Sequence, residues 1–425
     1  MTISHILILG AGPAGAAAAL AISQIPSPPS SPPLRITILE IRPKHVKTNN
    51  LGGSINLTPS AMRYLDRMGV GSEVRRIGIP VRGVDNVALR TGRLLGTLWK
   101  GVDACRVMRA DLVGVMRAEL EGREKEWVEI RYGVRVLEIR EEDGKVKVKL
   151  DGGEEVTGDL LLGCDGLHSA ARRLYVEPER TGSYSGKGVA YGFARVKEPG
   201  DAGLVRADGV AAVVDTTMFT GRYGAVLATF YEPSREKVFV GGVMSLREES
   251  FGPDGAVGFR AGDGDVEHVK GELRRRFGHS AVVGLPGLLE SVEDWTLFPV
   301  FTLPPGGRWA RGRVLLLGDA AHVMPPMGES IGLSIEDGAL IARVLTRHRE
   351  RSVEQMFADY EALRREPINK IDKELTWRWN NALKEDLGWL GTIFWECLAM
   401  VYLLVMRFKA KSYFSMDVEK LEPPA

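Results

Sequence analysis

Three glycines near the start of the chain have the spacing of a phosphate-binding turn. Gly10, Gly12 and Gly15 come directly after a mostly apolar run at residues 3–9, and an alanine-rich run at residues 16–22 follows them. The first glycine permits a sharp turn, the second lets the backbone approach a pyrophosphate, and the third lets a helix pack closely on a strand. The N–H groups at the start of that helix, together with its dipole, attract phosphate charge. The pattern predicts a strand, a turn and a helix that bind a dinucleotide.

A carboxylate, Glu40, stands at the end of the next predicted strand, residues 34–39. At that place a carboxylate can accept hydrogen bonds from both hydroxyls of an adenosine ribose. Glu40 comes 25 residues after Gly15, where about 20 are expected, and a proline-rich surface loop at residues 26–33 accounts for the excess. A solvated acid is the ordinary alternative for Glu40, and a ligand for an SH3-type partner is the alternative for the loop. The glycine turn favours the ribose-binding interpretation.

Two more apolar runs, residues 159–164 and 313–317, end in polar turns, Asp165-Gly166 and Gly318-Asp319. A helix is predicted to begin near Ser330, shortly after the second turn. A polar strand end with a helix N-terminus nearby is a site for anionic or hydroxylated groups of a ligand.

Another predicted helix begins with a cation. Arg109 precedes the apolar positions 112, 115, 116 and 120 of that helix, although helix N-termini favour acids. A bound phosphate or sugar would account for the arginine, as would an exposed charge. The glycine-rich residues 52–54 either approach a cofactor or form an ordinary turn.

The bulk composition narrows the class of protein. The chain has 425 residues, enough for two or three domains, and 44% hydrophobic with 26% charged residues is typical of a soluble globular protein. The net charge of +1 gives no support for a nucleic-acid partner. Cys105, Cys164 and Cys397 lie far apart without metal-ligand spacing, so we expect no metal, no disulfide framework and a reducing, cytoplasmic compartment. The apolar N-terminus is already used as the first strand, so no signal peptide is expected.

The middle of the chain has a different pattern, which predicts a mainly antiparallel sheet covered by a helix with apolar positions 266, 269, 273 and 277. The strands of this sheet are predicted at residues 189–196, 210–214, 224–231, 237–245 and 295–301. A hairpin within residues 133–150 is predicted to turn at Asp143-Gly144, and a helix containing Tyr360 is predicted to stop before Pro367.

Residues 387–406 are nearly all apolar and long enough to span a membrane. Glu396 opposes that interpretation, because a carboxylate at the bilayer centre costs on the order of 3 kcal/mol. Trp389 and Trp395 fit an interfacial or a buried helix. A packed core helix is favoured, with membrane association and self-association as open alternatives.

Together, these motifs resemble the single-component FAD-dependent monooxygenases of the p-hydroxybenzoate hydroxylase type, which include salicylate-hydroxylase-like proteins and fungal tailoring enzymes. The resemblance covers roughly residues 3–365. It implies an α/β fold, in which a Rossmann-type FAD-binding domain carries an inserted, mainly antiparallel β-sheet substrate domain and a C-terminal helical segment. We place the FAD-binding domain at residues 1–180 with 300–350, the substrate domain at 181–299 and the C-terminal helices at 351–425.

The resemblance also implies roles for individual residues. It places the FAD pyrophosphate at the glycine turn, the adenosine ribose at Glu40 and the ribityl chain at Asp319. Arg109 matches the arginine that begins an FAD-contacting helix of the family, and Asp165-Gly166 matches a motif linked to both FAD and NAD(P)H. The cofactor-binding candidates are Gly10, Gly12, Ala14, Gly15, Glu40, Arg109, Asp165, Gly166, Asp319 and Gly328. His168 and Arg42 are the candidates for NAD(P)H contact.

The chain departs from the family pattern after its paired prolines. The family usually has Gly-Gln-Gly there, whereas residues 327–332 read Met-Gly-Glu-Ser-Ile-Gly, and an acid near the flavin would disfavour its anionic reduced form. No acid or base is obligatory for this chemistry, so no catalytic residue is assigned. The candidates are His322 and Pro325 near the flavin and Tyr231 and Arg222 for the substrate, each with a plain structural role as its alternative.

The function implied by the resemblance is an NAD(P)H-dependent FAD monooxygenase. It would insert one oxygen atom from O2 into an aromatic, polyketide or terpenoid-type substrate through a C4a-hydroperoxyflavin. One alternative is a reductase, dehydrogenase or halogenase on the same scaffold; residues 377–379 are the text nearest to a halogenase motif but lack its Ile-Pro. The other is a non-catalytic flavin-binding or membrane-associated protein. The sequence predicts neither the choice between NADPH and NADH nor the oligomeric state.

Overall fold

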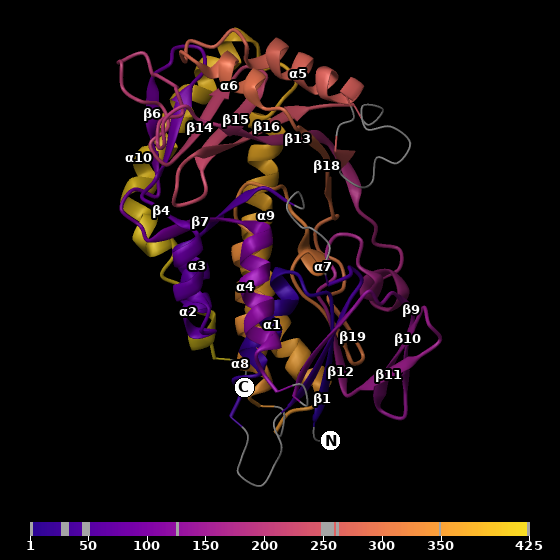
Figure 1. Cartoon of the computed structure of the whole chain (residues 1–425). Coiled ribbons are helices and arrows are strands. Elements are labelled where there is room, and N and C mark those ends of the chain that lie inside the picture. The colour runs from indigo at the N-terminus through magenta and orange to yellow at the C-terminus, as the bar shows by residue number, and fades with distance from the viewer. Residues whose placement is uncertain are drawn as a thin grey trace.

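The computed structural model describes residues 3–26, 34–44, 52–124, 127–247, 259–260, 263–347 and 350–422. Figure 1 shows one large sheet near each end of the molecule and long helices that run alongside. The predicted proline-rich loop lies almost entirely outside the described residues.

A six-stranded sheet confirms the predicted parallel core. Its strands, in spatial order, are β19 (Ala310–Arg311), β20 (Val314–Leu316), β12 (Leu160–Gly163), β1 (His5–Leu9), β2 (Arg35–Glu40) and β8 (Val128–Tyr132). All neighbours except β19 and β20 pair in parallel. The strands are continuous apolar runs because parallel strands in such a fold are buried on both faces. Because parallel strands end at the same edge, the turns that follow β1, β2, β12 and β20 meet there.

The helices that cover this sheet pack very closely against one another. α1 (Pro13–Ile22) packs against α8 (Ser330–Leu345) and α4 (Arg109–Glu121). A Cβ atom on Gly338 of α8 would lie only 2.6 Å from the backbone nitrogen of Ala18 and 2.7 Å from the carbonyl carbon of Ala17. The alanine-rich composition of α1 and the glycine of α8 therefore serve one close helix crossing.

A three-stranded antiparallel sheet packs against β1 and β12. Its strands are β9 (Val136–Glu142), β10 (Lys145–Leu150) and β11 (Glu155–Gly158). The predicted turn at Asp143-Gly144 is confirmed, since both residues have positive φ, 52° and 70°, as a tight hairpin turn requires.

The second large sheet has eight strands and is antiparallel except where β14 pairs in parallel with β5. In spatial order its strands are β17 (Phe259–Arg260), β18 (Thr296–Thr302), β13 (Ser183–Arg195), β16 (Lys237–Ser245), β15 (Gly224–Phe230), β14 (Thr216–Gly221), β5 (Val84–Ala88) and β6 (Leu94–Leu98). The helices α5 (Asp263–Phe277) and α6 (Leu285–Ser291) cover it (Figure 1). β5 and β6 come from residues that the boundaries above place in the first domain.

The strand predicted at residues 210–214 is wrong. Ala211 makes only an isolated bridge to Val205, and the strand begins at Thr216. Ala212 and Val213 are buried in the hydrophobic core of this half of the molecule. The apolar residues of this run therefore pack in the core from a loop and do not pair as a β-strand.

Between the two large sheets lies a small antiparallel sheet of β3 (Ser54–Leu57), β7 (Ala104–Met108) and β4 (Ile79–Val81). The helices α2 (Pro59–Arg67) and α3 (Gly71–Ile77) pack beside it. The first of these begins at Pro59, because Thr58 caps it and accepts a hydrogen bond from the backbone N–H of Ala61 at 3.2 Å.

The predicted helix stop at Pro367 is also wrong. A single helix, α9 (Val353–Ala382), passes through the proline. Proline removes one backbone hydrogen bond, but Ile368, Leu375 and Trp379 on the following turns are all buried. Burial of those side chains, of about 1.5–3 kcal/mol each, offsets the loss.

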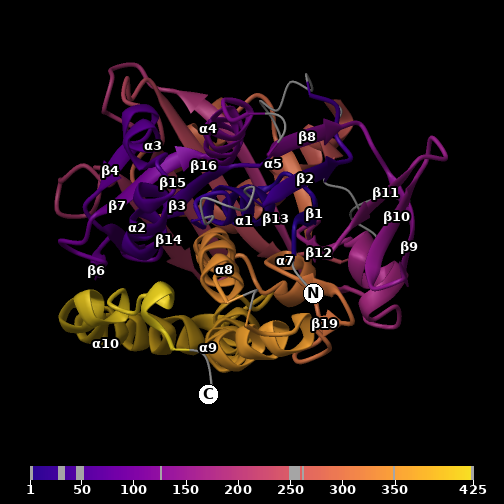
Figure 2. The same ribbon diagram turned by 90° about the horizontal axis from the view of Figure 1, so that it is seen from below.

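The last long helix is α10 (Gly388–Tyr413), which packs on β6 at the edge of the eight-stranded sheet. Among the described residues it is the one helix long and apolar enough to cross a membrane, and 22% of its apolar window is buried. Figure 2 shows α9 and α10 as a layer along one side of the molecule.

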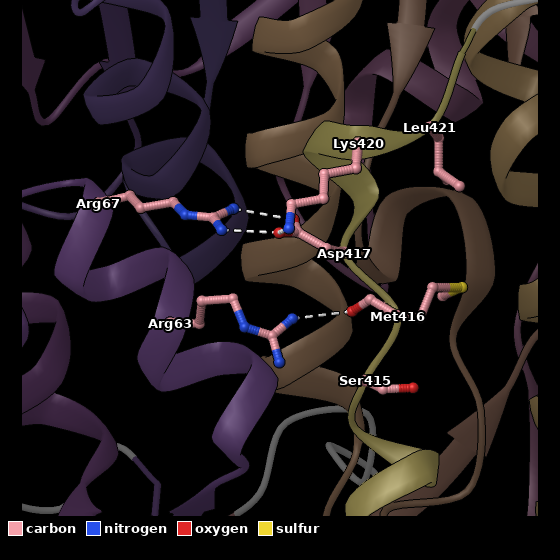
Figure 3. Close-up of a pocket in the computed structure, with 7 residues that line it drawn as sticks. All are labelled: Arg63, Arg67, Ser415, Met416, Asp417, Lys420 and Leu421. Carbon is pink, nitrogen blue, oxygen red and sulfur yellow. Dashed lines mark hydrogen bonds and ion pairs between the residues drawn. The ribbon is translucent and has the colours of Figure 1, made fainter.

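The segment after α10 returns across α2, where it lines a surface pocket (Figure 3). Arg67 donates to Asp417 at 2.7 and 2.8 Å, and Arg63 donates to the carbonyls of Phe414 and Met416. The guanidinium groups of this pocket therefore hold the segment that follows α10 against α2.

The crossing of α1 and α8 gives a prediction about stability. Replacing Gly338 with alanine should lower the free energy of unfolding by about 1–3 kcal/mol, because the new methyl group overlaps the backbone of α1. Gly271 of α5 is the matched control, since nothing lies within 4 Å of its Cβ position, and Gly271→Ala should stabilise by about 0.5–1 kcal/mol. Urea unfolding of both variants measures the difference, and equal effects would contradict the close crossing.

Candidate active site

The glycine turn has the geometry that its sequence predicts. Gly10 has φ of 90°, and a Cβ atom there would lie 2.7 Å from the carbonyl oxygen of Cys164, which directly follows the neighbouring strand β12. A Cβ atom on Gly15 would lie 1.9 Å from the carbonyl oxygen of Gly10. Gly12 differs from both, because nothing lies within 4 Å of its Cβ position. The first and third glycines are therefore required by the protein's own packing, whereas the second leaves the backbone open to a ligand.

Glu40 is buried against this turn. One of its carboxylate oxygens accepts hydrogen bonds from the backbone N–H of Ala11 at 2.8 Å and from Arg117 at 3.2 Å, and the other accepts from the backbone N–H of Arg42 at 2.9 Å. Arg117 also donates to the carbonyl of Ala11 at 2.9 Å. Arg117 is not among the candidates predicted from the sequence. Its position two helical turns after Arg109 on α4 is a sequence feature that points to it.

These residues line a cavity of about 270 Å³ at the edge of the parallel sheet. The cavity is rich in cations, and its charged lining residues are Glu40, Arg42, Lys44, Arg109, Arg117 and Glu121. Four positive and two negative side chains leave an excess of positive charge, which suits a ligand with phosphate groups.

The turn after β12 is held by its own aspartate. One oxygen of Asp165 accepts from the backbone N–H groups of Ala170 and Ala171, at 2.6 and 3.2 Å. Its other oxygen is buried and has no hydrogen-bond partner among the described residues. Burial raises the pKa of Asp165 above its ordinary value. A buried carboxylate oxygen without a partner points to a ligand that donates to it.

The turn after β20 is fixed by hydrogen bonds to Asp337 of α8, which in turn pairs with α9. Asp337 accepts from the backbone N–H of Gly318 at 2.7 Å, pairs with His322 at 2.8 Å and accepts from Arg364 at 2.7 Å. Burial alone would raise the pKa of Asp337, but His322 and Arg364 hold it well below the usual range. His322, a candidate catalytic residue, thus has a structural partner. Asp337 and Arg364 were not found from the sequence.

Asp319 and Arg109 are brought together at the same edge. Burial raises the pKa of Asp319, and the charge of Arg109 opposes that shift. Burial likewise lowers the pKa of Arg109, which the charge of Asp319 opposes. The side chain of Arg109 lies against Gly52, where a Cβ atom would come within 3.0 Å of it. The cation at the start of α4 is therefore half-buried, within electrostatic reach of Asp319, and is not a simple surface charge.

An aromatic cluster adjoins Arg109 and Gly52. Its buried members are Met108, Tyr191, Tyr231 and Phe239, with Phe193 and Phe298 packed against them. The hydroxyl of Tyr191 accepts a hydrogen bond from the N–H of Gly52 at 3.3 Å, and a Cβ atom on Gly53 would lie 2.5 Å from the ring of Phe239. Burial raises the pKa of Tyr231 to about 12, so its phenol is neutral at physiological pH.

The loop before α8 places an acid at the helix N-terminus. Gly328 has φ of 109° and an open Cβ position, and Pro325 is buried beside it in the chain. One carboxylate oxygen of Glu329 is buried without a hydrogen-bond partner among the described residues. Burial raises the pKa of Glu329 to about 7, against the charge of Arg378 on α9.

Of the remaining predicted residues, Arg222 and His168 are at the surface and Arg42 lines the cationic cavity. Arg222 is on the surface and pairs with Asp386 at 2.6 Å, because the end of β14 faces the start of α10. His168 is exposed, with its ring 6.4 Å from that of Phe301. Arg42 lines the same cavity as Glu40. The structure therefore does not bring Arg222 to the other candidates.

Three observations indicate that the residues at this edge of the parallel sheet could hold FAD. The backbone at Gly12 is open, the cavity beside it is cationic, and Asp165 has an acceptor without a partner. In the part of the chain that the structure describes, no group of three or more His, Cys, Asp or Glu residues could hold a metal ion.

Comparisons with known proteins identify the family. A family model described as an FAD binding domain matches residues 4–189 and 282–373. The 6-hydroxynicotinate 3-monooxygenase of Pseudomonas fluorescens is 26% identical over 398 residues, which cover 91% of this chain and 94% of that protein.

Two crystal structures share the fold. A salicylate hydroxylase in complex with its substrate has a TM-score of 0.78 at 18% identity, with 100% of this chain and 99% of that chain covered. HpxO of Klebsiella pneumoniae, in complex with FAD and uric acid, has a TM-score of 0.76 at 21% identity, with 96% of each chain covered. Since the family model spans more than half of the chain, the protein belongs to the FAD-dependent aromatic monooxygenases of the p-hydroxybenzoate hydroxylase and salicylate hydroxylase type.

Proposed function

We propose that this FAD-dependent monooxygenase hydroxylates a small aromatic or heteroaromatic substrate, with NADPH or NADH as the electron donor. The observation that carries the proposal is the aromatic cluster that adjoins Gly52 and Arg109, next to the cationic cavity. Aromatic rings of a substrate pack well in offset or edge-on contact with such side chains. A phenol or the aromatic ring of a polyketide-type metabolite fits this surface, as does a hydroxylated pyridine.

FAD is held, in this proposal, by the turns that converge at the edge of the parallel sheet. Gly10, Gly12, Ala14 and Gly15 receive the pyrophosphate, and Glu40 receives the ribose. A carboxylate offers about four acceptor sites, so Glu40 keeps capacity beyond its bonds to Ala11, Arg42 and Arg117. When bound, FAD would take two electrons from NAD(P)H and pass them to O2, so that one oxygen atom enters the substrate and the other leaves as water.

The other residues orient the flavin and set the charge around it. Arg109, Asp165 and Gly166, together with Asp319 and Gly328, complete the FAD site. The N-terminal end of α8 stabilises negative charge, since its backbone N–H groups and dipole are positive there. The aromatic cluster excludes water. His168, which is exposed, is the proposed contact for the nicotinamide cosubstrate, and His322 positions the turn at Gly318 through Asp337.

The activity is tested with isotopically labelled dioxygen. The purified holoenzyme is incubated with NADPH or NADH and a panel of phenols, hydroxypyridines, aromatic polyketides and terpenoids. We expect NAD(P)H consumption that depends on one class of aromatic compound and a product heavier by one labelled oxygen, measured by mass spectrometry. An oxidised product without label would indicate a dehydrogenase or reductase, and halide incorporation would indicate a halogenase. A yellow protein that neither nicotinamide reduces would contradict the proposal.

Arg117 provides a test of the dinucleotide site. Arg117→Met leaves the carboxylate of Glu40 and the carbonyl of Ala11 without their charged donor, so the Kd for FAD should rise about ten- to a hundredfold. The control is Arg35→Met on the same strand as Glu40, where a half-exposed pair with Glu129 at 3.8 Å contributes little. Titration of the apoprotein with FAD, followed by flavin fluorescence, gives both constants. Equal affinities would place the dinucleotide elsewhere.

Glu329 gives a prediction about pH. Its pKa is about 7 in the folded protein against an ordinary 4.5, so the folded state holds an extra proton between these values and loses stability as the pH rises through them. Glu329→Gln mimics the protonated acid and should match the wild type at pH 4 but exceed its stability by on the order of 3 kcal/mol at pH 8. Urea unfolding at both values measures this difference. Glu329 faces Arg378 and Glu374 on α9 and Tyr402 on α10, which are left unchanged. A difference that does not depend on pH would show that the carboxyl group does not titrate there.

A further inference from the structure

The outer face of α10 reverses the usual pattern of a soluble helix. Its exposed residues recur at steps of three and four, as positions on one helix face do. They form a stripe made up of Leu390, Phe394, Cys397, Val401, Leu404 and Phe408. Phe408 is 79% exposed and Leu390 75%. The inner face, by contrast, buries polar Thr392 and the carboxylate of Glu396. The helix therefore turns its one acid to the protein, together with Leu403, Met406 and Ala410, and keeps a continuous hydrophobic stripe on the outside.

Contacts at three places fix α10 in this orientation. At its start, the backbone N–H of Leu387 donates to the carbonyl of Arg222 at 3.1 Å. In the middle, Glu396 accepts two hydrogen bonds from Arg90, and a Cβ atom on Gly96 of β6 would lie 3.0 Å from Leu403. At its end, Arg63 holds the carbonyl of Phe414 at 2.6 Å. A helix held along its whole length cannot rotate to hide its apolar stripe.

The charges around the stripe indicate what covers it. Glu396 is the single acid between residues 388 and 413, and it faces inward. The exposed charges of this helix, Arg407 and Lys409 close to its C-terminal end, are positive. Trp389 is exposed at the opposite end of the helix. Two acids, Glu385 and Asp386, precede the helix, and Asp386 is paired with Arg222. The apolar stripe with its aromatic residues and its basic C-terminal end complements the surface of an anionic bilayer.

We infer that α10 docks the enzyme on a lipid bilayer with anionic headgroups, lying in the plane of the interface and not across the membrane. A spanning arrangement would pull α10 away from β6 and leave Glu396 in the hydrocarbon without Arg90. An in-plane helix keeps every contact of the inner face and buries the stripe beside the headgroups. Figure 2 places α10 at the border of the molecule, where a flat surface can reach it.

The test uses the full-length holoenzyme and vesicles of two compositions, phosphatidylcholine alone and phosphatidylcholine with about one third phosphatidylserine. We expect co-sedimentation with the anionic vesicles, weaker binding to the neutral ones, and a decrease as salt is added. The variant Phe394→Glu with Phe408→Glu should lower the bound fraction about tenfold or more. The matched control is Val283→Glu, which places the same charge at an apolar side chain that is 66% exposed outside α10. Arg407→Gln with Lys409→Gln should remove the preference for anionic vesicles.

Depth is measured with a fluorophore on Cys397, which is exposed in the stripe while Cys105 and Cys164 are buried. Lipid-borne quenchers near the headgroups should quench it more than quenchers at the bilayer centre. Quenching from the centre would overturn the in-plane arrangement. No vesicle binding by the wild type, or binding that the stripe variant leaves unchanged, would overturn membrane docking. A lipid-free dimer that the stripe variant converts to a monomer, without vesicle binding, would assign the stripe to a second copy of the chain instead.

Discussion

One buried carboxylate, Asp337, joins the elements that the rest of the site depends on. It lies on α8, accepts from the backbone of Gly318 at the end of β20, and pairs with His322 of α7 (Asp319–His322) and Arg364 of α9. Arg364 also donates to Glu336 and to the carbonyl of Leu333, both at 2.9 Å, so each of its three guanidinium nitrogens makes a hydrogen bond. A buried charge is tolerated only when it is paired and hydrogen-bonded in this way, and loss of one partner leaves the others uncompensated. The position of the Asp319 turn is therefore set by α8 and α9, which come later in the chain.

The opposite side of the site is organised by short-range geometry. Ala11, Glu40 and Arg117 form a closed set of three hydrogen bonds at the first turn, in which Ala11 takes part through its backbone N–H and carbonyl. The two sides come together because the parallel strands that lead into them end at a common edge. The candidate site therefore has one side built around the glycine turn and another built from a buried ion network.

This division explains which parts could be predicted from the sequence. The glycine turn and Glu40 could be, because each is specified by residues close to it in the chain. Arg117, Asp337 and Arg364 could not, because their partners are fixed only by tertiary packing. The same reason underlies the wrong predictions of secondary structure. Pro367 removes a backbone hydrogen bond that burial on later turns offsets, and the apolar run at residues 210–214 serves a loop in the core. The antiparallel sheet was predicted in kind, but its β5 and β6 strands come from a distant segment.

The hydropathy of α10 shows a further limit of reading a helix by composition. A run of apolar residues with one acid favours a core helix but leaves a membrane-associated helix open, since composition does not say which side the acid faces. The structure adds that direction: Glu396 faces Arg90 and the stripe faces outward. It also shows what lies on the inner side, where Arg378 of α9 stands 5.2 Å from the ring of Tyr402 and its charge reaches Glu329. One helix therefore separates the exposed stripe from the acid at the N-terminus of α8. Burial raises the pKa of Glu329, and the cation that opposes this rise, Arg378, is the same one that contacts Tyr402 of α10, so the inner face of α10 adjoins the surroundings of that acid.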